Sequence, residues 1–249
     1  MTLSDAEVER YSRQLVMGEW SGEAQEALKA ASVIVIGAGA LGSPALTYLV
    51  AAGVGRVGVV DPDDIELSNL HRQPLHLTPD LGGSKAVNAA VKLAFLNPEV
   101  QIDSYPVALE AANAAAIVAG ASVVVDCSDS FATRYDVNDA CCAERVPLVE
   151  GGVAAWSALV LSVKPGESAC YRCSFPVHPP EESCAETGVV GALAGVIGSI
   201  QALEAIKLIS GVGEPLLDTI LQLDGRTMEQ TLVATERQPG CAACGALSH

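Results

Sequence analysis

Two cysteine pairs, each with the spacing Cys-x-x-Cys, lie far apart in this sequence, at Cys170/Cys173 and Cys241/Cys244. Four thiolates are a ligand set that suits tetrahedral Zn²⁺ with a closed coordination shell. Because such a site leaves no open position for water, we expect it to be structural and to fasten the C-terminal tail to the body. Two disulfides or a redox pair fit a cytosolic chain less well, although the segment between the pairs is longer than in a usual zinc ribbon.

A glycine pattern near the N-terminus is typical of a loop that binds nucleotide phosphates. It follows a short β-branched run, residues 32–36, and opens an apolar helix, as phosphate binding by a helix N-terminus requires. Asp61 ends the next strand-like run about 20 residues further on, where a carboxylate can accept hydrogen bonds from ribose hydroxyls. The alternative is a tight turn that only packs the helix on the strand. The residues expected to approach the nucleotide are Gly37, Gly39, Ala40 and Gly42.

Hydrogen-bond donors are concentrated just after the second predicted strand, and Lys85 begins a helix shortly afterwards. The guanidinium of Arg72 and the ammonium of Lys85 could neutralise a triphosphate and the charge that develops when pyrophosphate leaves. A hydride-transferring enzyme has no need of such a cluster, so the cluster favours ATP over a dinucleotide. The alternative is a surface loop with ordinary cations. The donor-rich segment comprises Ser68, Asn69, Leu70, His71, Arg72 and Gln73.

Two aspartates, Asp126 and Asp129, follow another buried run, residues 123–125. Open α/β sheets bind their ligands at this carboxyl edge. Asp129 can hold Mg²⁺ against phosphates, because that ion takes one or two carboxylates together with substrate oxygens. For Asp126 two other roles stay open, a helix N-cap or a hydrogen-bond partner at the end of the strand.

The order of the predicted elements indicates which fold positions these residues. Strand, glycine turn, helix and strand in succession form a βαβ unit with a parallel sheet, and the alternation continues to about residue 150. We therefore predict an α/β fold, a doubly wound, mostly parallel Rossmann-like sheet with a zinc-clipped C-terminal extension that contains antiparallel strands. The predicted helices cover 4–30, the segment up to 52, 85–96, 111–119, 132–144 and 189–210, and the predicted strands 32–36, 56–61, 100–107, 123–126, 147–150, 158–163 and 219–235.

Composition limits the class of protein. The chain has 249 residues, is half apolar and only 18% charged, which predicts a compact globular protein. Its net charge of −16 argues against partners that are nucleic acids or anionic membranes. The N-terminus is acidic and unlike a signal peptide, and the longest apolar run, 188–200, contains glycines and ends at Gln201. We expect a cytoplasmic protein in which that run is a buried helix.

These motifs together resemble those of the ThiF/MoeB/HesA family, the bacterial relatives of the ubiquitin-activating enzymes. The segment Arg10-Tyr11-Ser12-Arg13-Gln14 and residues 198–207 add to the resemblance, which runs from about residue 6 to about 245. It implies adenylation of the C-terminal glycine of a small ubiquitin-like sulfur-carrier protein, with release of pyrophosphate. It also implies a single domain, 1–249, composed of N-terminal helices (1–30), a nucleotide-binding half (31–150) and a carrier-binding, zinc-containing half (151–249).

The resemblance implies roles for the matched residues of the nucleotide-binding half. Asp61 would hold the ATP ribose, and Asp129 would hold Mg²⁺. Asn69, Arg72 and Lys85 would hold the phosphates. The cofactors implied are therefore ATP, Mg²⁺ and, at the four cysteines, Zn²⁺.

Three further residues matter to the resemblance. Arg13 would reach across a homodimer interface into the ATP site of the partner subunit. Ser130 stands where family members often have asparagine, so it can still donate a hydrogen bond but lacks the second group of an amide. Cys184 occupies a position that in some members forms a covalent link with the activated carrier and in others is dispensable, and an idle exposed thiol is the alternative.

Two other classes of function are weighed against the adenylating enzyme. An NAD-dependent oxidoreductase would have no use for Arg13, Arg72 or Lys85, and a non-catalytic, zinc-stabilised adaptor would tolerate Asp129→Ala. The expected partners are a carrier that ends in Gly-Gly and a separate sulfur donor, because the chain ends at His249 without a rhodanese-like domain. Molybdopterin, thiamine, tRNA thiolation and cysteine synthesis all remain open as pathways.

Overall fold

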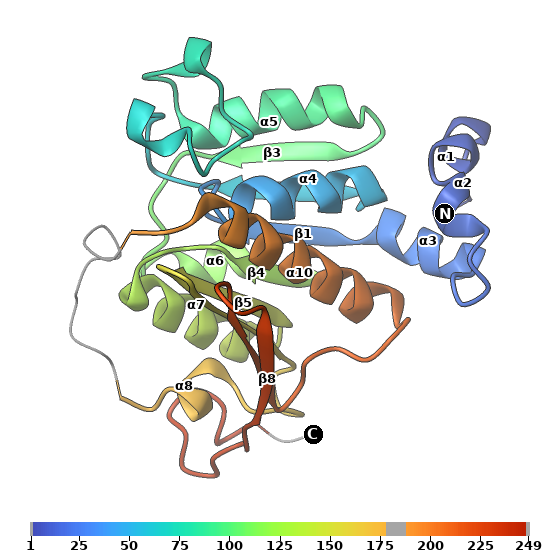
Figure 1. Cartoon of the computed structure of the whole chain (residues 1–249). Helices are drawn as coiled ribbons and strands as arrows, with labels where there is room; N and C mark the ends of the chain where they lie inside the picture. Colours follow the sequence, from blue (N-terminus) through green and yellow to red (C-terminus); the bar gives the residue numbers. More distant parts are fainter. Residues whose placement is uncertain (1, 178–187, 248–249) are drawn as a thin grey trace.

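The computed structural model of the chain describes residues 2–177 and 188–247. In this part of the chain one eight-stranded sheet is covered by helices on both faces (Figure 1). The strands are β1 (Ser32–Ile36), β2 (Arg56–Val60), β3 (Gln101–Tyr105), β4 (Val123–Asp126), β5 (Leu148–Ala154), β6 (Ser157–Val163), β7 (Thr219–Asp224) and β8 (Glu229–Ala234). The helices are α1 (Asp5–Arg10), α2 (Ser12–Leu15), α3 (Gly22–Ala30), α4 (Gly42–Ala52), α5 (Lys85–Leu96), α6 (Ala114–Val118), α7 (Phe131–Glu144), α8 (Tyr171–Ser174) and α10 (Gly191–Ser210), with 3-10 turns η1 (Leu67–Asn69) and η2 (Thr78–Asp80).

The strand order, β3-β2-β1-β4-β5-β6-β7-β8, confirms the predicted doubly wound, mostly parallel sheet. Strands β1 to β5 pair in parallel, and β5 to β8 pair antiparallel. The antiparallel strands therefore continue the same sheet. From β1 the chain moves outward to β3 and then returns to the other side of β1 as β4. The segments that follow β1 and β4 thus diverge, which opens a crevice at their carboxyl ends.

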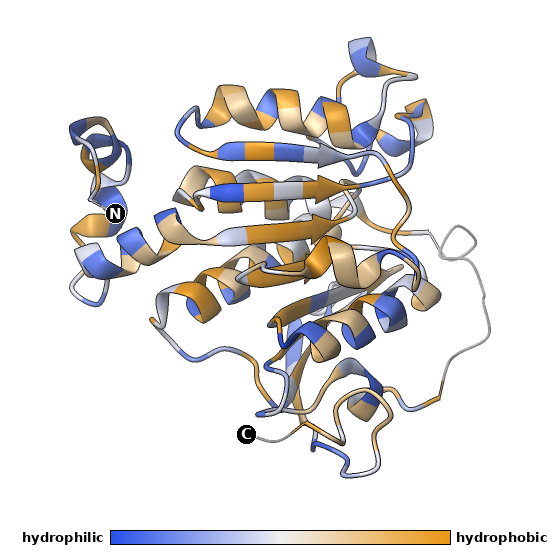
Figure 2. Ribbon diagram, turned by 180° about the vertical axis from the view of Figure 1, so that it is seen from behind, coloured by the Kyte–Doolittle hydropathy of each residue, from blue (hydrophilic) through white to orange (hydrophobic). Residues whose placement is uncertain are grey.

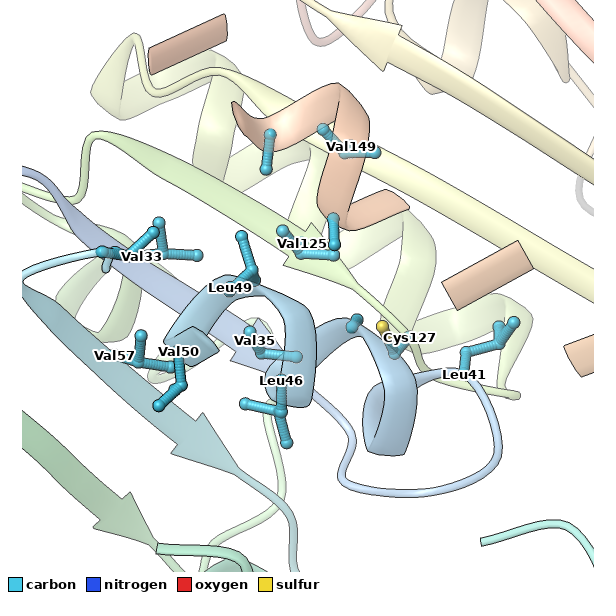
Figure 3. Close-up of a cluster of buried hydrophobic side chains, with 14 of the residues drawn as sticks. Val33, Val35, Leu41, Leu46, Leu49, Val50, Val57, Val125, Cys127 and Val149 are labelled. Atoms are coloured by element: carbon cyan, nitrogen blue, oxygen red, sulfur yellow. The ribbon is translucent and has the colours of Figure 1, made fainter. Parts of the chain in front are cut away.

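Helices α4, α5 and α10 cover one face of the sheet, and α6 and α7 cover the other (Figure 1). Because the inner parallel strands are buried on both faces, they are almost continuously apolar, as the colouring of β1 shows (Figure 2). Val33 and Val35 of β1 lie in one core cluster with Leu46 and Leu49 of α4 (Figure 3). A second cluster, on the face of α6 and α7, includes three of the paired cysteines, namely Cys170, Cys173 and Cys244.

Helix α10 is long and apolar enough to cross a membrane by length and composition alone. It nevertheless packs on the sheet and buries two polar side chains, Gln201 and Glu204. Gln201 Nε2 donates to the carbonyl oxygen of Asp126 at 2.6 Å, and Glu204 Oε2 accepts from Ser162 Oγ at 2.9 Å. These bonds join the helix to the sheet, so α10 is a core helix, as the sequence predicts.

Gly198 allows α10 to lie directly against the start of α4. A Cβ at this position would lie 2.1 Å from the carbonyl oxygen of Leu41 and 2.6 Å from the Pro44 ring. We expect Gly198→Ala to lower the free energy of unfolding by about 1–3 kcal/mol through overpacking, despite the better helix propensity of alanine. Gly195→Ala is the matched control, because an added Cβ there meets nothing within 4 Å. Denaturant titration should find the control neutral or stabilised by up to ~1 kcal/mol, and equal losses in both variants would contradict the argument.

The N-terminal segment differs from the continuous helical stretch expected over 4–30. It forms three helices, α1, α2 and α3, with breaks at Tyr11 and over residues 16–21, and serines cap the first and the third helix. Ser4 Oγ accepts from Glu7 N and Ser21 Oγ accepts from Ala24 N, each at 3.2 Å. Between α1 and α2 the side chain of Tyr11 turns into the interior. The apolar pattern alone did not reveal these interruptions.

Candidate active site

A cleft of about 650 Å³ opens at the carboxyl ends of β1, β2 and β4, at the switch point of the sheet. Its volume is that of a small-molecule site. Most of the residues predicted from the sequence converge on it from separate segments of the chain. Those that line it are Gly37, Gly39, Ala40, Asp61, His71, Arg72, Gln73, Lys85, Asp129 and Ser130.

The glycine loop depends on the absence of side chains at two positions. Gly37 has φ +91°, in the left-handed region, and a Cβ there would lie 2.9 Å from the carbonyl oxygen of Cys127. A Cβ on Gly42 would lie 1.9 Å from the carbonyl oxygen of Gly37, so α4 can begin directly behind the loop only with glycine. Gly42 therefore shapes the loop without lining the cleft, and it begins α4, whose N-terminus is a favourable place for an anion.

Asp61, at the end of β2, is buried and tied to the loop. Its Oδ2 accepts from Ala38 N at 2.7 Å, and its Oδ1 accepts from Asp63 N at 2.9 Å. Burial raises the pKa of Asp61 above its ordinary value, and these two backbone hydrogen bonds oppose the shift. Each carboxylate oxygen keeps a second lone pair, so Asp61 can still accept a ribose hydroxyl.

The two predicted cations of the site are held by weak partners. Lys85 Nζ contacts Asp63 Oδ2 at 2.7 Å, and the side chains of Lys85 and Asp63 are 7% and 63% exposed. Arg72 Nη1 donates to the carbonyl oxygen of Ser68 at 2.8 Å and lies 3.0 Å from His71 Nε2. Because the ion pair of Lys85 is open to water at Asp63, and Arg72 is held by a backbone carbonyl and a histidine, phosphate oxygens can compete for both cations.

Three predicted residues, Ser68, Asn69 and Leu70, are not among the described residues that line the cleft. Asn69 is buried, and its Oδ1 accepts from Glu66 N at 3.0 Å, which closes the turn η1. The carbonyl oxygen of Ser68 accepts from Arg72. In this structure these residues therefore shape the backbone that presents Arg72.

Asp129 and Ser130 project from the end of β4 at the wall of the cleft, and both are exposed. Ser130 is the N-cap of α7, because its Oγ accepts from Thr133 N at 3.4 Å. Serine thus performs a capping task for which asparagine is equally suited. The exposed carboxylate of Asp129 fits Mg²⁺, which completes its shell with phosphate oxygens and water.

Arg13 lies on the side of the molecule away from the cleft. It is exposed on α2, which precedes α3 and the amino end of β1, whereas the cleft is at the carboxyl ends of the strands (Figure 1). Arg13 is not among the described residues that line the cleft. Within one chain, the structure therefore does not bring Arg13 to the other predicted residues.

The structure adds residues that the sequence analysis did not assign to the site. His76 is buried, with Nε2 2.9 Å from the carbonyl oxygen of Ala38 and Nδ1 3.0 Å from Asn88 Oδ1, so it supports the glycine loop from behind. Asp63 and Arg134 line the cleft. A single histidine or arginine that belongs to no recognisable motif does not reveal a functional site in one sequence. Only the fold shows which residues surround it.

The four paired cysteines meet in one cluster, with all their Sγ atoms within 4.8 Å of one another. The Sγ–Sγ distances are 3.8 Å for Cys170–Cys173, 3.6 Å for Cys170–Cys241 and 3.4 Å for Cys173–Cys244. Tetrahedral Zn²⁺ with Zn–S bonds of about 2.3 Å separates its sulfurs by about 3.8 Å, whereas a disulfide needs about 2.05 Å. The cluster therefore fits Zn²⁺ and not two disulfides.

Without a cation, three of these four thiols resist ionisation. Burial raises the pKa of Cys173 and of Cys244, and a hydrogen bond with Cys142, followed by burial, raises the pKa of Cys170. For Cys241, burial acts in the same direction, but backbone N–H groups of Cys244 and its neighbour outweigh it and lower the pKa to about 7. A divalent cation offsets the cost of ionising the other three.

The remaining cysteines differ from this cluster. Cys184 lies outside the residues that the structure describes. Cys127, Cys141 and Cys142 are buried. Burial raises the pKa of Cys127 and Cys141 well above the ordinary value, as expected of small core residues rather than reactive thiols.

Curated proteins of similar sequence are adenylating enzymes by name. The chain is 46% identical over 253 residues to a sulfur carrier protein adenylyltransferase of Thermus thermophilus, and the match covers 98% of this chain and 93% of that protein. It is 42% identical over 248 residues to the SAMP-activating enzyme E1 of Haloferax volcanii, with 92% of that protein covered. An adenylyltransferase and sulfurtransferase MOCS3 of Drosophila virilis is 42% identical, but the chain spans only 55% of its length.

Solved structures of similar fold include Escherichia coli MccB with ATP, with a TM-score of 0.85 over 95% of this chain and 74% of that chain. The sequence identity is 23%, so the likeness concerns the fold alone. The pattern of the ThiF family matches residues 11–243, nearly the whole chain. With the fold, the cleft and the relatives of more than 40% identity, this match shows that the chain belongs to the ThiF family.

Proposed function

We propose that the protein uses ATP to adenylate the C-terminal carboxylate of a small ubiquitin-like sulfur-carrier protein that ends in Gly-Gly. The observation that carries the proposal is the convergence of a glycine loop, Asp61, Arg72, Lys85 and Asp129 on one cleft. The names of the Thermus and Haloferax relatives, whose lengths the chain covers almost fully, support this substrate class.

The reaction joins two anions, so its main difficulty is electrostatic. A carboxylate oxygen of the carrier attacks the α-phosphorus of ATP, the bond from that phosphorus to the bridging oxygen breaks, and pyrophosphate leaves with the electron pair. Arg72 and Lys85 offset the repulsion and stabilise the leaving group, while Asp61 and the glycine loop hold the nucleoside in line. When bound beside Asp129, Mg²⁺ supplies further charge neutralisation.

The product, a mixed anhydride of the carrier and AMP, requires no protein nucleophile for its formation. Sulfur can then enter by attack on the carbonyl carbon, with AMP as the leaving group. Among the described residues that line the cleft, Cys127 is a buried thiol whose raised pKa, due to burial, makes it a poor nucleophile. We therefore propose that a separate protein brings the sulfur.

Exchange of labelled pyrophosphate into ATP tests the proposal. We expect exchange only when a Gly-Gly carrier is present, and none when the same carrier lacks its terminal glycine, because the attacking carboxylate is then misplaced. Failure with every Gly-Gly carrier tried, in a preparation that binds ATP, would support the adaptor alternative instead.

We further propose that the enzyme is a homodimer in which Arg13 enters the cleft of the partner subunit. The exposed position of Arg13, away from its own cleft, supports this arrangement. Arg13→Ala and Asp129→Ala should each lower exchange by about 10²-fold or more as pure dimers. Mixed dimers should regain activity, because one of their two clefts contains both residues. Mixing and re-equilibrating the two inactive variants measures this, and no gain over either variant alone would contradict action across subunits.

A further inference from the structure

Three ionisable side chains are buried at the cleft: Arg134 of α7, which is 6% exposed and lines the cleft, and Glu150 of β5 and Asp126 at the end of β4, which are both 0% exposed. Arg134 Nη1 donates to Glu150 Oε1 at 2.7 Å. Its Nη2 donates to the carbonyl oxygen of Ser128 at 2.8 Å. One guanidinium thus joins a buried carboxyl group to the backbone of the loop that follows β4.

This buried group contains two carboxyl groups and one guanidinium. Two of their carboxyl oxygens, Glu150 Oε2 and Asp126 Oδ2, are buried and have no hydrogen-bond partner among the described residues. Burial, followed by the neighbouring Asp126, raises the pKa of Glu150 well above its ordinary value. The ion pair with Arg134 opposes this shift and offsets part of the cost of a buried carboxylate.

Strand β5 runs between these side chains, and two successive residues in it, Gly151 and Gly152, have no side chain. A Cβ on Gly152 would lie 3.0 Å from Arg134 Nη1, and a Cβ on Gly151 would lie 2.3 Å from Cδ of Gln201. Gln201 Nε2 in turn donates to the carbonyl oxygen of Asp126 at 2.6 Å. Side chains from both faces of the sheet, Arg134 and Gln201, therefore reach the same short stretch of backbone, residues 126–128.

The residue that this stretch presents is Asp129. Ser128 N donates to Asp126 Oδ1 at 2.8 Å on one side of it, and Ser130 caps α7 on the other. The carbonyl oxygen of Ser128, which Arg134 binds, belongs to the peptide group that leads directly into Asp129. The position of the Asp129 carboxylate in the cleft is thus set by a backbone that buried side chains fix.

We propose that Arg134 is a positioning residue for the adenylation site, which clamps the Ser128 carbonyl and thereby places Asp129 against the metal-bound phosphates of ATP. The inference rests on the proposed function. Arg134 acts here through the backbone, and its anchor is the buried Glu150. A shift of about 1 Å in a residue that orients a reacting group can cost about 10²-fold in rate, which is why such a clamp matters.

The test replaces Arg134 with methionine, which fills the space without the forked donors. In titration calorimetry without carrier, the gain in ATP affinity that Mg²⁺ confers should fall about tenfold, as for other residues that orient a metal ligand. The affinity for adenosine should stay within about twofold, because Asp61 and the glycine loop are untouched. The maximal rate of exchange should fall about 10²-fold. Arg134→Lys should recover little, since one ammonium cannot bridge Glu150 and Ser128.

Arg172→Met is the matched control. Arg172 also pairs with a carboxylate of α7, Asp139 at 2.6 Å, but it is not among the described residues that line the cleft. This variant should keep the Mg²⁺-dependent gain in ATP affinity and the rate of exchange. If Arg134→Met lowered only the melting temperature and kept both quantities, Arg134 would be purely structural and the inference would be overturned.

A second variant decides the matter if Arg134→Met fails to fold. Glu150→Gln keeps an acceptor for Arg134 Nη1 but removes the charge that anchors it, and it should raise the Mg²⁺ concentration for half-maximal ATP binding about tenfold. An unchanged value would overturn the inference. If wild-type protein showed no exchange with any Gly-Gly carrier, the proposed function would fail instead, while the calorimetric comparison would still judge the role of Arg134.

Discussion

Replacement of Asp129 with alanine is expected to lower carrier-dependent pyrophosphate exchange by about 10²- to 10³-fold, the largest effect of any single change in the cleft. Asp129 is the exposed carboxylate at the end of β4, opposite the glycine loop and the cations Arg72 and Lys85. Without it, the metal that screens the phosphates loses its protein anchor, and the carrier carboxylate must approach a more negative ATP. The maximal rate should therefore fall more than the affinity for ATP.

Asp136→Ala provides the matched control for this prediction. Asp136 lies on α7, which begins directly after Ser130, but it is not among the described residues that line the cleft. Exchange should stay within about twofold of wild type in the control. Carrier binding, measured by calorimetry without ATP, should be unchanged in both variants. An Asp129→Ala protein with normal exchange would contradict the assigned role and would favour the adaptor.

The sequence was enough to predict the helices and strands that are determined by their own residues. The helix over 85–96 was predicted with its observed bounds, because Ser84 caps it and its apolar residues recur with helical period. The buried strand β1 follows equally from an unbroken β-branched run. The cleft could be predicted because one edge of a parallel sheet, the carboxyl edge, brings together the glycine loop, Asp61 and Asp129.

What the sequence could not supply depends on contacts between distant segments. Arg134 and Glu150 belong to different elements. Their spacing in the sequence does not indicate that Glu150 is fully buried or that Arg134 binds it. The support of Ala38 by His76 arises in the same way, from a loop that folds back under the glycine turn. Asn69 was predicted to hold phosphates and Ser68 to belong to the nucleotide site. In this structure both residues shape the turn that carries Arg72, and residue type does not encode the direction of a side chain.

Removal of zinc is expected to lower the melting temperature by about 10 °C or more. Structural zinc sites can contribute more than 10 kcal/mol to folding in small domains, and even a third of that value shifts the melting temperature of a chain of this size by about this amount. Cys244 is fully buried and belongs to the core cluster on the face of α6 and α7, so an empty site would leave unpaired thiols within that cluster. Cys244→Ser should show the same loss and contain no zinc.

The consequences for ATP should be much smaller than those for stability. The cysteine cluster contacts the body through α7, where Asn138 Oδ1 accepts from Tyr171 N at 2.8 Å, while the glycine loop and Lys85 belong to the other face. Below its lowered melting temperature, Cys244→Ser should therefore bind ATP within about threefold of wild type. Cys141 is buried but is not one of the four clustered cysteines, so Cys141→Ala should retain zinc. A chelated protein with an unchanged melting temperature would show that these four thiols do not hold a structural metal.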